Sequence, residues 1–243
     1  MKNKSTFYII LIISLCLISC NSNKVLFSDN FEAYTTNKFT SNIWKVEGDV
    51  TVDTTKMFYG KQSIRFKSGE GYANRAFITL QNPILTNIEA FYGALKMYVK
   101  EASPDGIHWT MIQVAGKTPR GFYAEVRYGG QYDKRLMANY DTKGIKTDCW
   151  HHTVFKIPEK KWFSVQWYMN RKSNNMKLWI EGILVHELNA NNLQKGCLNN
   201  ENNQEWTFPK FELLTLGWVD YQTNGGEREV WIDDVKLSTT MIK

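Results

Sequence analysis

The feature that most constrains this chain is the alternation of side chains between His108 and Thr142. Three strand-like runs lie here, at 109–115, 122–128 and 135–140, and glycine-bearing turns separate them. In each run, small or aliphatic residues alternate with polar or aromatic ones. Successive side chains of a strand point to opposite faces, so this pattern predicts an antiparallel sheet with one buried face.

The second face of this predicted sheet has unusual chemistry. Strict alternation places Trp109 and Met111 on the side of Gln113, opposite Ile112 and Val114. The polar groups predicted to share the exposed face are those of Gln113, Glu125, Arg127 and Asn139. An amide-rich, charged face with aromatic neighbours suits a polar chain such as a polysaccharide, including an acidic one. A solvated face with ordinary ion pairs remains the alternative.

The rest of the chain repeats the same kind of pattern. Short alternating runs include 25–33, 44–53, 91–99 and 230–237, and turn residues separate them at regular spacing. No window after the first residues has the periodicity of an amphipathic helix. About twelve short strands of this kind predict an all-β fold, a two-sheet antiparallel sandwich or jelly roll, in one domain over residues 25–240.

The first residues are predicted to be a signal and not part of the fold. Residues 1–19 combine a basic head with an apolar stretch, and the sequence Leu17-Ile-Ser-Cys20 follows the pattern of a bacterial lipobox. We expect removal of 1–19, acylation of Cys20 and a polar tether over 20–24. A transmembrane anchor is less favoured because a bilayer span needs about 20 apolar residues. The prediction is a cell-envelope lipoprotein, in the outer membrane or at the cell surface, that contacts membrane only through its lipid.

Besides the acylated Cys20, two cysteines remain in the predicted mature chain, Cys149 and Cys197. In an oxidising compartment a disulfide between them is expected, and the chain-entropy account gives it about 3–4 kcal/mol. Two buried free thiols are the alternative. A zinc site is disfavoured because no Cys-x-x-Cys occurs and His151 is adjacent to His152. The net charge of +6 comes without a long basic run, so no nucleic-acid partner is predicted.

Short motifs spread along the mature chain resemble a known family. They are Asp29-Asn-Phe-Glu32, His108-Trp-Thr, Arg127-Tyr-Gly-Gly-Gln131, Leu136-Met-Ala-Asn-Tyr140, Asp148-Cys-Trp150, Trp162-x4-Trp167, Trp179-x2-Gly182, Leu216-Gly-Trp218 and Trp231-Ile-Asp-Asp-Val235. As a set they resemble the secreted jelly-roll proteins that include the fungal cellulose-induced protein, similar in fold to glucuronan lyases. The resemblance implies a concave carbohydrate-facing groove and a structural calcium ion. It leaves binding or cleavage open. Ser164 and Gln166 depart from the family pattern, where a thiol and a carboxylate are expected.

The resemblance also implies a set of calcium ligands. An early glutamate, a turn carbonyl and a late aspartate hold the ion in such jelly rolls, and here Glu32, the carbonyl of Lys61 and Asp233 match. Calcium prefers six to eight oxygen ligands of these types. Ordinary surface acids are the alternative.

A lyase acting on a uronic acid needs a group that neutralises the carboxylate, a base and an acid. The candidates are Arg127 and Gln113 for the carboxylate, and His108 or Tyr140 for the proton. Against this, Tyr140 has the parity of core residues, and Ala115 stands where alginate lyases carry a histidine after their Gln-x pair. A glycoside hydrolase needs two groove carboxylates and is the weaker reading, since Glu125 is alone on these strands.

Aromatic residues are predicted to supply sugar-stacking rings. Trp218 and Tyr221 are the candidates, with Trp109 and Trp167 as further ones, although aromatic residues are also common core material. The sequence therefore predicts an extracytoplasmic lipoprotein that engages polysaccharide in a groove, with lyase activity left open. A structural surface protein without a glycan ligand is the alternative.

Overall fold

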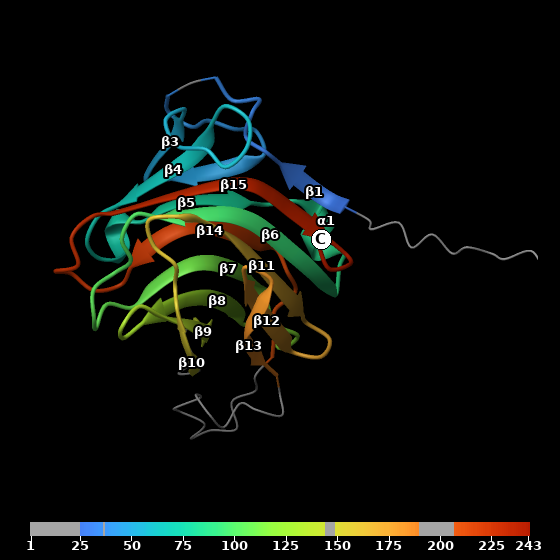
Figure 1. The fold of residues 1–243 in the computed structure, drawn as a ribbon. Coiled ribbons are helices and arrows are strands. Elements are labelled where there is room, and N and C mark those ends of the chain that lie inside the picture. The colour runs from blue at the N-terminus through green and yellow to red at the C-terminus, as the bar shows by residue number, and fades with distance from the viewer. Residues whose placement is uncertain (1–24, 36, 144–148, 190–206) are drawn as a thin grey trace, which may run out of the picture.

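The computed structural model describes residues 25–35, 37–143, 149–189 and 207–243, and these form a two-layer β-sandwich (Figure 1). The predicted signal, Cys20, the tether and Cys197 lie outside the described residues. Within the described part, no helix is long and apolar enough to span a bilayer. The predicted all-β sandwich is confirmed.

One sheet, called sheet A, has the order β13-β12-β11-β6-β15-β4-β3, and β1 pairs with β15. Its strands are β1 (Val25–Asp29), β3 (Asp49–Asp53), β4 (Ser63–Ser68), β6 (Ala90–Val99), β11 (Trp162–Asn170), β12 (Asn175–Ile180), β13 (Ile183–Leu188) and β15 (Arg228–Ser238). The first and last strands are therefore neighbours, as expected for a closed sandwich.

The second sheet, sheet B, has the order β10-β9-β8-β7-β14-β5-β2. Its strands are β2 (Trp44–Glu47), β5 (Ala76–Leu80), β7 (Trp109–Lys117), β8 (Tyr123–Gln131), β9 (Arg135–Thr142), β10 (Cys149–Lys156) and β14 (Leu213–Asp220). Two short helical turns, η1 (Tyr72–Asn74) and α1 (Pro83–Thr86), lie between strands of the two sheets.

The prediction of one continuous strand over residues 44–53 is wrong. Gly48 interrupts it with a φ of 78°, so β2 pairs in sheet B while β3 pairs in sheet A. A Cβ at Gly48 would lie 2.0 Å from the carbonyl oxygen of Arg75. Only glycine tolerates both this backbone conformation and this close approach.

The core lies between the inner faces of the two sheets and is largely aliphatic and aromatic. Strand β6 illustrates it: Phe91, Leu95 and Met97 are fully or nearly fully buried, while Tyr92 and Lys96 are partly exposed. The two outer faces are thus free to carry polar and aromatic groups, and the strand registers decide which groups meet there.

Candidate functional site

One row of side chains crosses all seven strands of sheet B on its outer face. The antiparallel registers align its members in the order Lys45, Thr79, Thr215, Gln113, Arg127, Asn139 and Trp150. Directly opposite residues of neighbouring strands lie about 5 Å apart and interact. The hydroxyls of Thr79 and Thr215 are 2.9 Å apart, which shows that the row is a connected polar strip.

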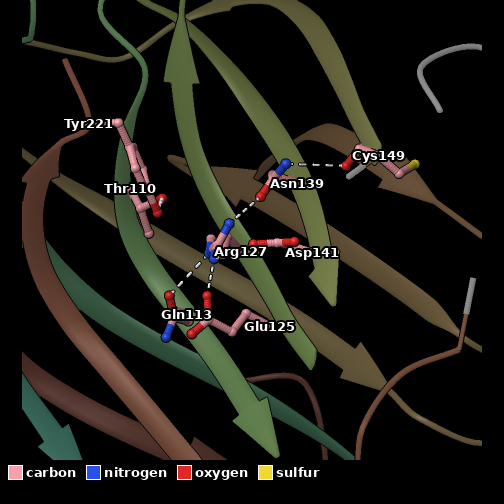
Figure 2. A network of polar contacts seen from close by, with 8 residues as sticks. All are labelled: Thr110, Gln113, Glu125, Arg127, Asn139, Asp141, Cys149 and Tyr221. Atoms are coloured by element: carbon pink, nitrogen blue, oxygen red, sulfur yellow. Dashed lines mark hydrogen bonds and ion pairs between the residues drawn. The ribbon is translucent and has the colours of Figure 1, made fainter. Parts of the chain in front are cut away.

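Arg127 is the centre of this row and is 7% exposed (Figure 2). Its Nε donates to Oε1 of Gln113 at 3.1 Å, and its Nη1 donates to Oδ1 of Asn139 at 2.6 Å. Its Nη2 donates to Glu125 and, at 3.3 Å, to Asp141. The structure therefore brings together the four polar residues predicted for this face and adds Asp141 of β9, which lies opposite Glu125.

The Arg127 contacts limit what the guanidinium can do. Two carboxylates already offset its charge, and its fork of donors is occupied by protein groups. The expectation that Arg127 directly neutralises a substrate carboxylate is not supported by this geometry. Instead, Arg127 fixes the amide of Gln113 with its oxygen inward, so the Gln113 nitrogen points away from Arg127 (Figure 2).

Tyr140 does not join this site. It is 3% exposed, belongs to the hydrophobic core, and its hydroxyl donates to the carbonyl oxygen of Thr207 at 2.8 Å. Its prediction as a proton-transfer residue is therefore wrong. The alternation of β9 puts Tyr140 on the face of Leu136 and Ala138, because the pairing of β9 with β8 has no bulge that would turn it outward.

The tyrosine beside Arg127 is Tyr221. Its ring stacks on His108 with centroids 4.6 Å apart and on Tyr72 with centroids 5.6 Å apart. The guanidinium carbon of Arg127 lies 5.8 Å from the centre of the Tyr221 ring. The Tyr221 hydroxyl and the Thr110 hydroxyl are 3.2 Å apart, within hydrogen-bond reach (Figure 2). Tyr221, and not Tyr140, is therefore the tyrosine whose side chain lies beside Arg127.

His108 is held as a neutral imidazole at the edge of this cluster. Burial, together with the positive charge of Arg127 and the proximity of His152, lowers the pKa of His108 to about 4. Its backbone N–H donates to Oε1 of Gln222, and its carbonyl accepts the N–H of Tyr221. These two bonds join the entrance of β7 to the loop after β14, so they position the stacked rings.

The prediction that Trp218 supplies a sugar-stacking ring is wrong. It is fully buried and stacks face to face on Trp109, with centroids 4.3 Å apart at 11°. Trp167 is fully buried as well. The predicted face of Trp109 and Met111 is also wrong, because β7 carries an extra residue between Thr110 and Ile112 relative to β8. A bulge of this kind reverses the alternation on one side of it.

An open groove of about 270 Å³ lies over β2, β5, β14 and β7 beside the Arg127 cluster. Its lining residues are Lys45, Glu47, Tyr72, Arg75, Phe77, Thr79, Gln81, Gln113, Leu213, Thr215 and Tyr221. Aromatic rings and aliphatic surface alternate with amides, hydroxyls and the Arg75–Glu47 ion pair. This combination, apolar walls with a few placed polar groups, is typical of ligand sites.

The residues implied for calcium meet at one loop. Oε1 of Glu32 accepts the N–H of Lys61 at 2.9 Å, and Oδ2 of Asp233 accepts those of Phe58 and Tyr59 at 3.0 Å. Asp233 is 1% exposed, and burial raises the pKa of its carboxyl. No cationic side chain in the described ranges pairs with it. Those ranges also contain no group of three or more histidine, cysteine, aspartate or glutamate side chains that could hold a metal ion. Two carboxylates that contact the same loop are oxygen ligands of the type that calcium prefers, so the donor set fits in type.

Cys149 opens β10 and is disulfide-bonded. Its predicted partner, Cys197, lies outside the described residues, so that pairing stays a prediction. The carbonyl oxygen of Cys149 accepts from Nδ2 of Asn139 at 3.4 Å, which connects the disulfide-bearing strand to the Arg127 cluster.

Sandwich and groove together define a β-jelly-roll protein with a candidate ligand site on the outer face of sheet B. The family profile described as Cip1-like, core domain, of the polysaccharide-lyase-like group, matches residues 30–240. The chain belongs to this family, which confirms the resemblance drawn from the motifs. No curated protein sequence matches significantly.

Solved structures support the fold. The structure of "Cellulose induced protein, Cip1" matches with a TM-score of 0.66 and 18% identity, covering 89% of this chain and 98% of the other. A structure titled "Cell entry of botulinum neurotoxin type C is dependent upon interaction with two ganglioside molecules" matches at 0.53 and 16% identity, covering 82% of this chain and 43% of the other. The botulinum neurotoxin serotype D/C VPI 5993 binding domain matches at 0.52 and 17%, covering 82% and 44%. At these identities the likeness concerns the fold alone.

Proposed function

We propose that the protein binds a polysaccharide chain in the groove of sheet B. The observation that carries this proposal is the lining of the groove. Tyr72, Tyr221 and Phe77 offer ring surfaces there, while Gln113 and Thr215 offer hydrogen-bonding groups on the same floor. Sugar rings present both C–H faces and hydroxyls, so they need this mixture of apolar contact and polar partners.

The Gln113 amide is the central recognition group in this proposal. Its oxygen is taken by Arg127, and its nitrogen makes no hydrogen bond within the described part of the chain. The buried Arg127 therefore acts as a positioning residue that presents the Gln113 N–H donors to the ligand. An amide oriented in advance binds more strongly, because less side-chain freedom is lost on association.

Affinity electrophoresis in gels that contain a soluble polysaccharide tests the proposal. Glucuronan, alginate and pectin serve as acidic probes and a mixed-linkage β-glucan serves as the neutral one. We expect Gln113→Ala and Tyr221→Ala to be retarded less than the parent, while the matched control Tyr132→Ala, an exposed tyrosine on the turn between β8 and β9 that does not line the groove, is retarded like the parent. Equal migration of all three variants and the parent would contradict the groove assignment.

A second candidate function, β-elimination at a uronate, is favoured by one observation. His108 is a neutral base stacked on Tyr221, whose hydroxyl faces Thr110. In such a reaction the C5–H and C4–O bonds break, a C4=C5 double bond forms, and the leaving oxygen takes a proton. His108 would accept the C5 proton, the Tyr221 hydroxyl would donate the proton that the leaving oxygen takes, and the Gln113 amide would face the uronate carboxylate.

Absorbance near 235 nm separates binding from cleavage, because elimination products carry an unsaturated uronate. Cleavage predicts a rise with an acidic probe that Tyr221→Phe abolishes while retardation in the gel persists. Retardation of the parent without any rise in absorbance would leave binding as the function and remove the lyase candidate.

We also propose a structural calcium ion held by Glu32, Asp233 and the carbonyl of Lys61. The support is a buried carboxylate, that of Asp233, without a cationic partner in the described part, and a second carboxylate, that of Glu32, which contacts the same loop. A bound divalent cation would offset this buried charge and hold the 58–62 loop against β15.

The cellular setting is part of the proposal and rests on the sequence. Lipidation at Cys20 would place the domain at the cell envelope, where polysaccharides are accessible. Labelling of cells with an alkyne fatty acid tests this: the parent should take up label and Cys20→Ala should not. Label retained by the Cys20→Ala variant would exclude this anchor.

A further inference from the structure

The outer face of sheet A carries aromatic residues that the groove of sheet B does not use. On β6 the partly exposed positions Tyr92, Ala94, Lys96 and Tyr98 alternate with buried core residues. Neighbouring strands add further partly exposed aromatic residues to this face. We name this group of residues the outer aromatic face; its members are Tyr92, Tyr98, Trp162, Tyr168 and Trp179.

The strand registers gather these rings into two clusters. In one cluster Tyr168 lies opposite Tyr92, with ring centroids 4.6 Å apart, and Trp179 lies 6.2 Å from Tyr92. In the other, Trp162 lies opposite Tyr98 with centroids 5.9 Å apart. Tyr92 and Tyr98 are six positions apart on one extended strand, which corresponds to about 20 Å.

A depression of about 230 Å³ lies between the two clusters. A bulge in β15 between Asp233 and Lys236 helps to form it, since Asp234 there has a φ of 50°. Lys96, Ser164 and Gln166 line the depression, together with Lys243 and the Asp234–Lys236 ion pair, whose charges offset each other. The Gln166 oxygen accepts the N–H of Ile242 at 2.9 Å, which leaves its amide nitrogen as a donor toward the depression.

The charges on this face indicate the chemistry of a ligand. Nζ of Lys96 contacts the Ser164 hydroxyl at 2.8 Å and lies over the ring of Phe58. Nζ of Lys56 lies 3.9 Å from the centre of the Tyr98 ring. Within the described ranges, neither ammonium group pairs with a carboxylate. Rings with adjacent unneutralised cations form a surface complementary to a sugar chain that carries negative charge.

We infer that the outer aromatic face is a second glycan-binding surface, which takes a segment of acidic polysaccharide lying along β6 and β11. Sugar rings pack on the two aromatic clusters, and carboxylates of the chain meet Lys56 and Lys96. This surface is on the opposite sheet from the groove, so the inference does not rest on the proposed groove function. Two surfaces on one domain would let the protein hold two polysaccharide segments at once, which raises avidity.

Variants of the outer aromatic face test this inference in the full chain. Trp162→Ala and Trp179→Ala, which lie outside the hydrophobic core, should each weaken retardation by glucuronan roughly threefold to tenfold, the effect of losing one ring contact. Lys96→Met keeps the aliphatic stem and should weaken binding of glucuronan while leaving that of neutral β-glucan unchanged. The control Tyr132→Ala, on the turn between β8 and β9, should match the parent. Circular dichroism and the melting temperature confirm that each variant is folded.

The two surfaces are separated by repeating the measurements in a Tyr221→Ala background. Retardation that remains there and then disappears with Trp162→Ala or Trp179→Ala supports the second surface, whatever the groove does. Folded Trp162→Ala and Trp179→Ala proteins that migrate like the parent in both backgrounds would overturn it. An unchanged affinity of Lys96→Met for glucuronan would overturn the acidic assignment. A shift in sedimentation of the glycan-free variants would show a protein contact instead, and would also overturn the inference.

Discussion

Replacing Arg127 by methionine tests whether this residue organises the site. The change removes a 7%-exposed cation and leaves the carboxylates of Glu125 and Asp141 without their partner. Loss of one partner of a buried ion pair costs 3–5 kcal/mol. The Glu125 and Asp141 side chains are 22% and 41% exposed and can rehydrate, so the lower end applies, about 3 kcal/mol.

For a domain of this size, a loss of about 3 kcal/mol lowers the melting temperature by roughly 6–12 °C. Thermal unfolding followed by circular dichroism measures it. Glu125→Gln is the matched variant, and it should cost about 1 kcal/mol because Arg127 keeps Asp141 and both amides. The double variant should show a coupling of about 1–2 kcal/mol between the two sites.

The same variant should also be retarded less by the glycan than the parent, because Gln113 is no longer held. If Arg127→Met melts within about 2 °C of the parent and is retarded normally, Arg127 neither supports the fold nor positions Gln113. That result would refute the account of the site given above.

Three further predictions concern other parts of the molecule. Burial lowers the pKa of His186 to about 3, so the folded state favours the neutral imidazole. The contribution of His186 to the free energy of unfolding is therefore fully present above pH 6.5. It falls by about 1.4 kcal/mol per pH unit as the pH drops toward 3. The urea midpoint of His186→Gln should therefore change less with pH, between pH 6.5 and 4, than that of the parent. Equal slopes of midpoint against pH for the two proteins would contradict this. EDTA should lower the melting temperature of the parent by roughly 5–10 °C if calcium is present at 100 times its dissociation constant. It should leave the melting temperature of Asp233→Asn unchanged. If EDTA does not change the melting temperature of the parent and elemental analysis detects no calcium, the calcium site does not exist. Cys149→Ser should cost about 3–4 kcal/mol in chemical denaturation, and reduction of the parent should cost the same. A variant as stable as the parent would show that the disulfide contributes nothing.

Local patterning predicted much of this protein correctly. The all-β class and the strands at the centre of the chain followed from period-two alternation, and so did the shared face of Glu125 and Arg127. Alternation is a property of the pleated backbone itself, and each strand carries it without help from the rest of the fold. For the same reason, the parity of Tyr140 already indicated the core position that the structure confirms.

Tertiary structure alone decided the remaining features. The extra residue in β7 turned Trp109 inward, where the absence of a side chain at Gly130 leaves room for its indole ring. The contact of Tyr221 with Arg127 joins a loop after β14 to the middle of β8, segments far apart in the chain. Alternation assigns a residue to a face, whereas bulges and the order of strands in a sheet depend on packing between distant segments. The sequence by itself therefore determined the sheets and their polar faces, and only the closing of the sandwich determined which side chains meet on them.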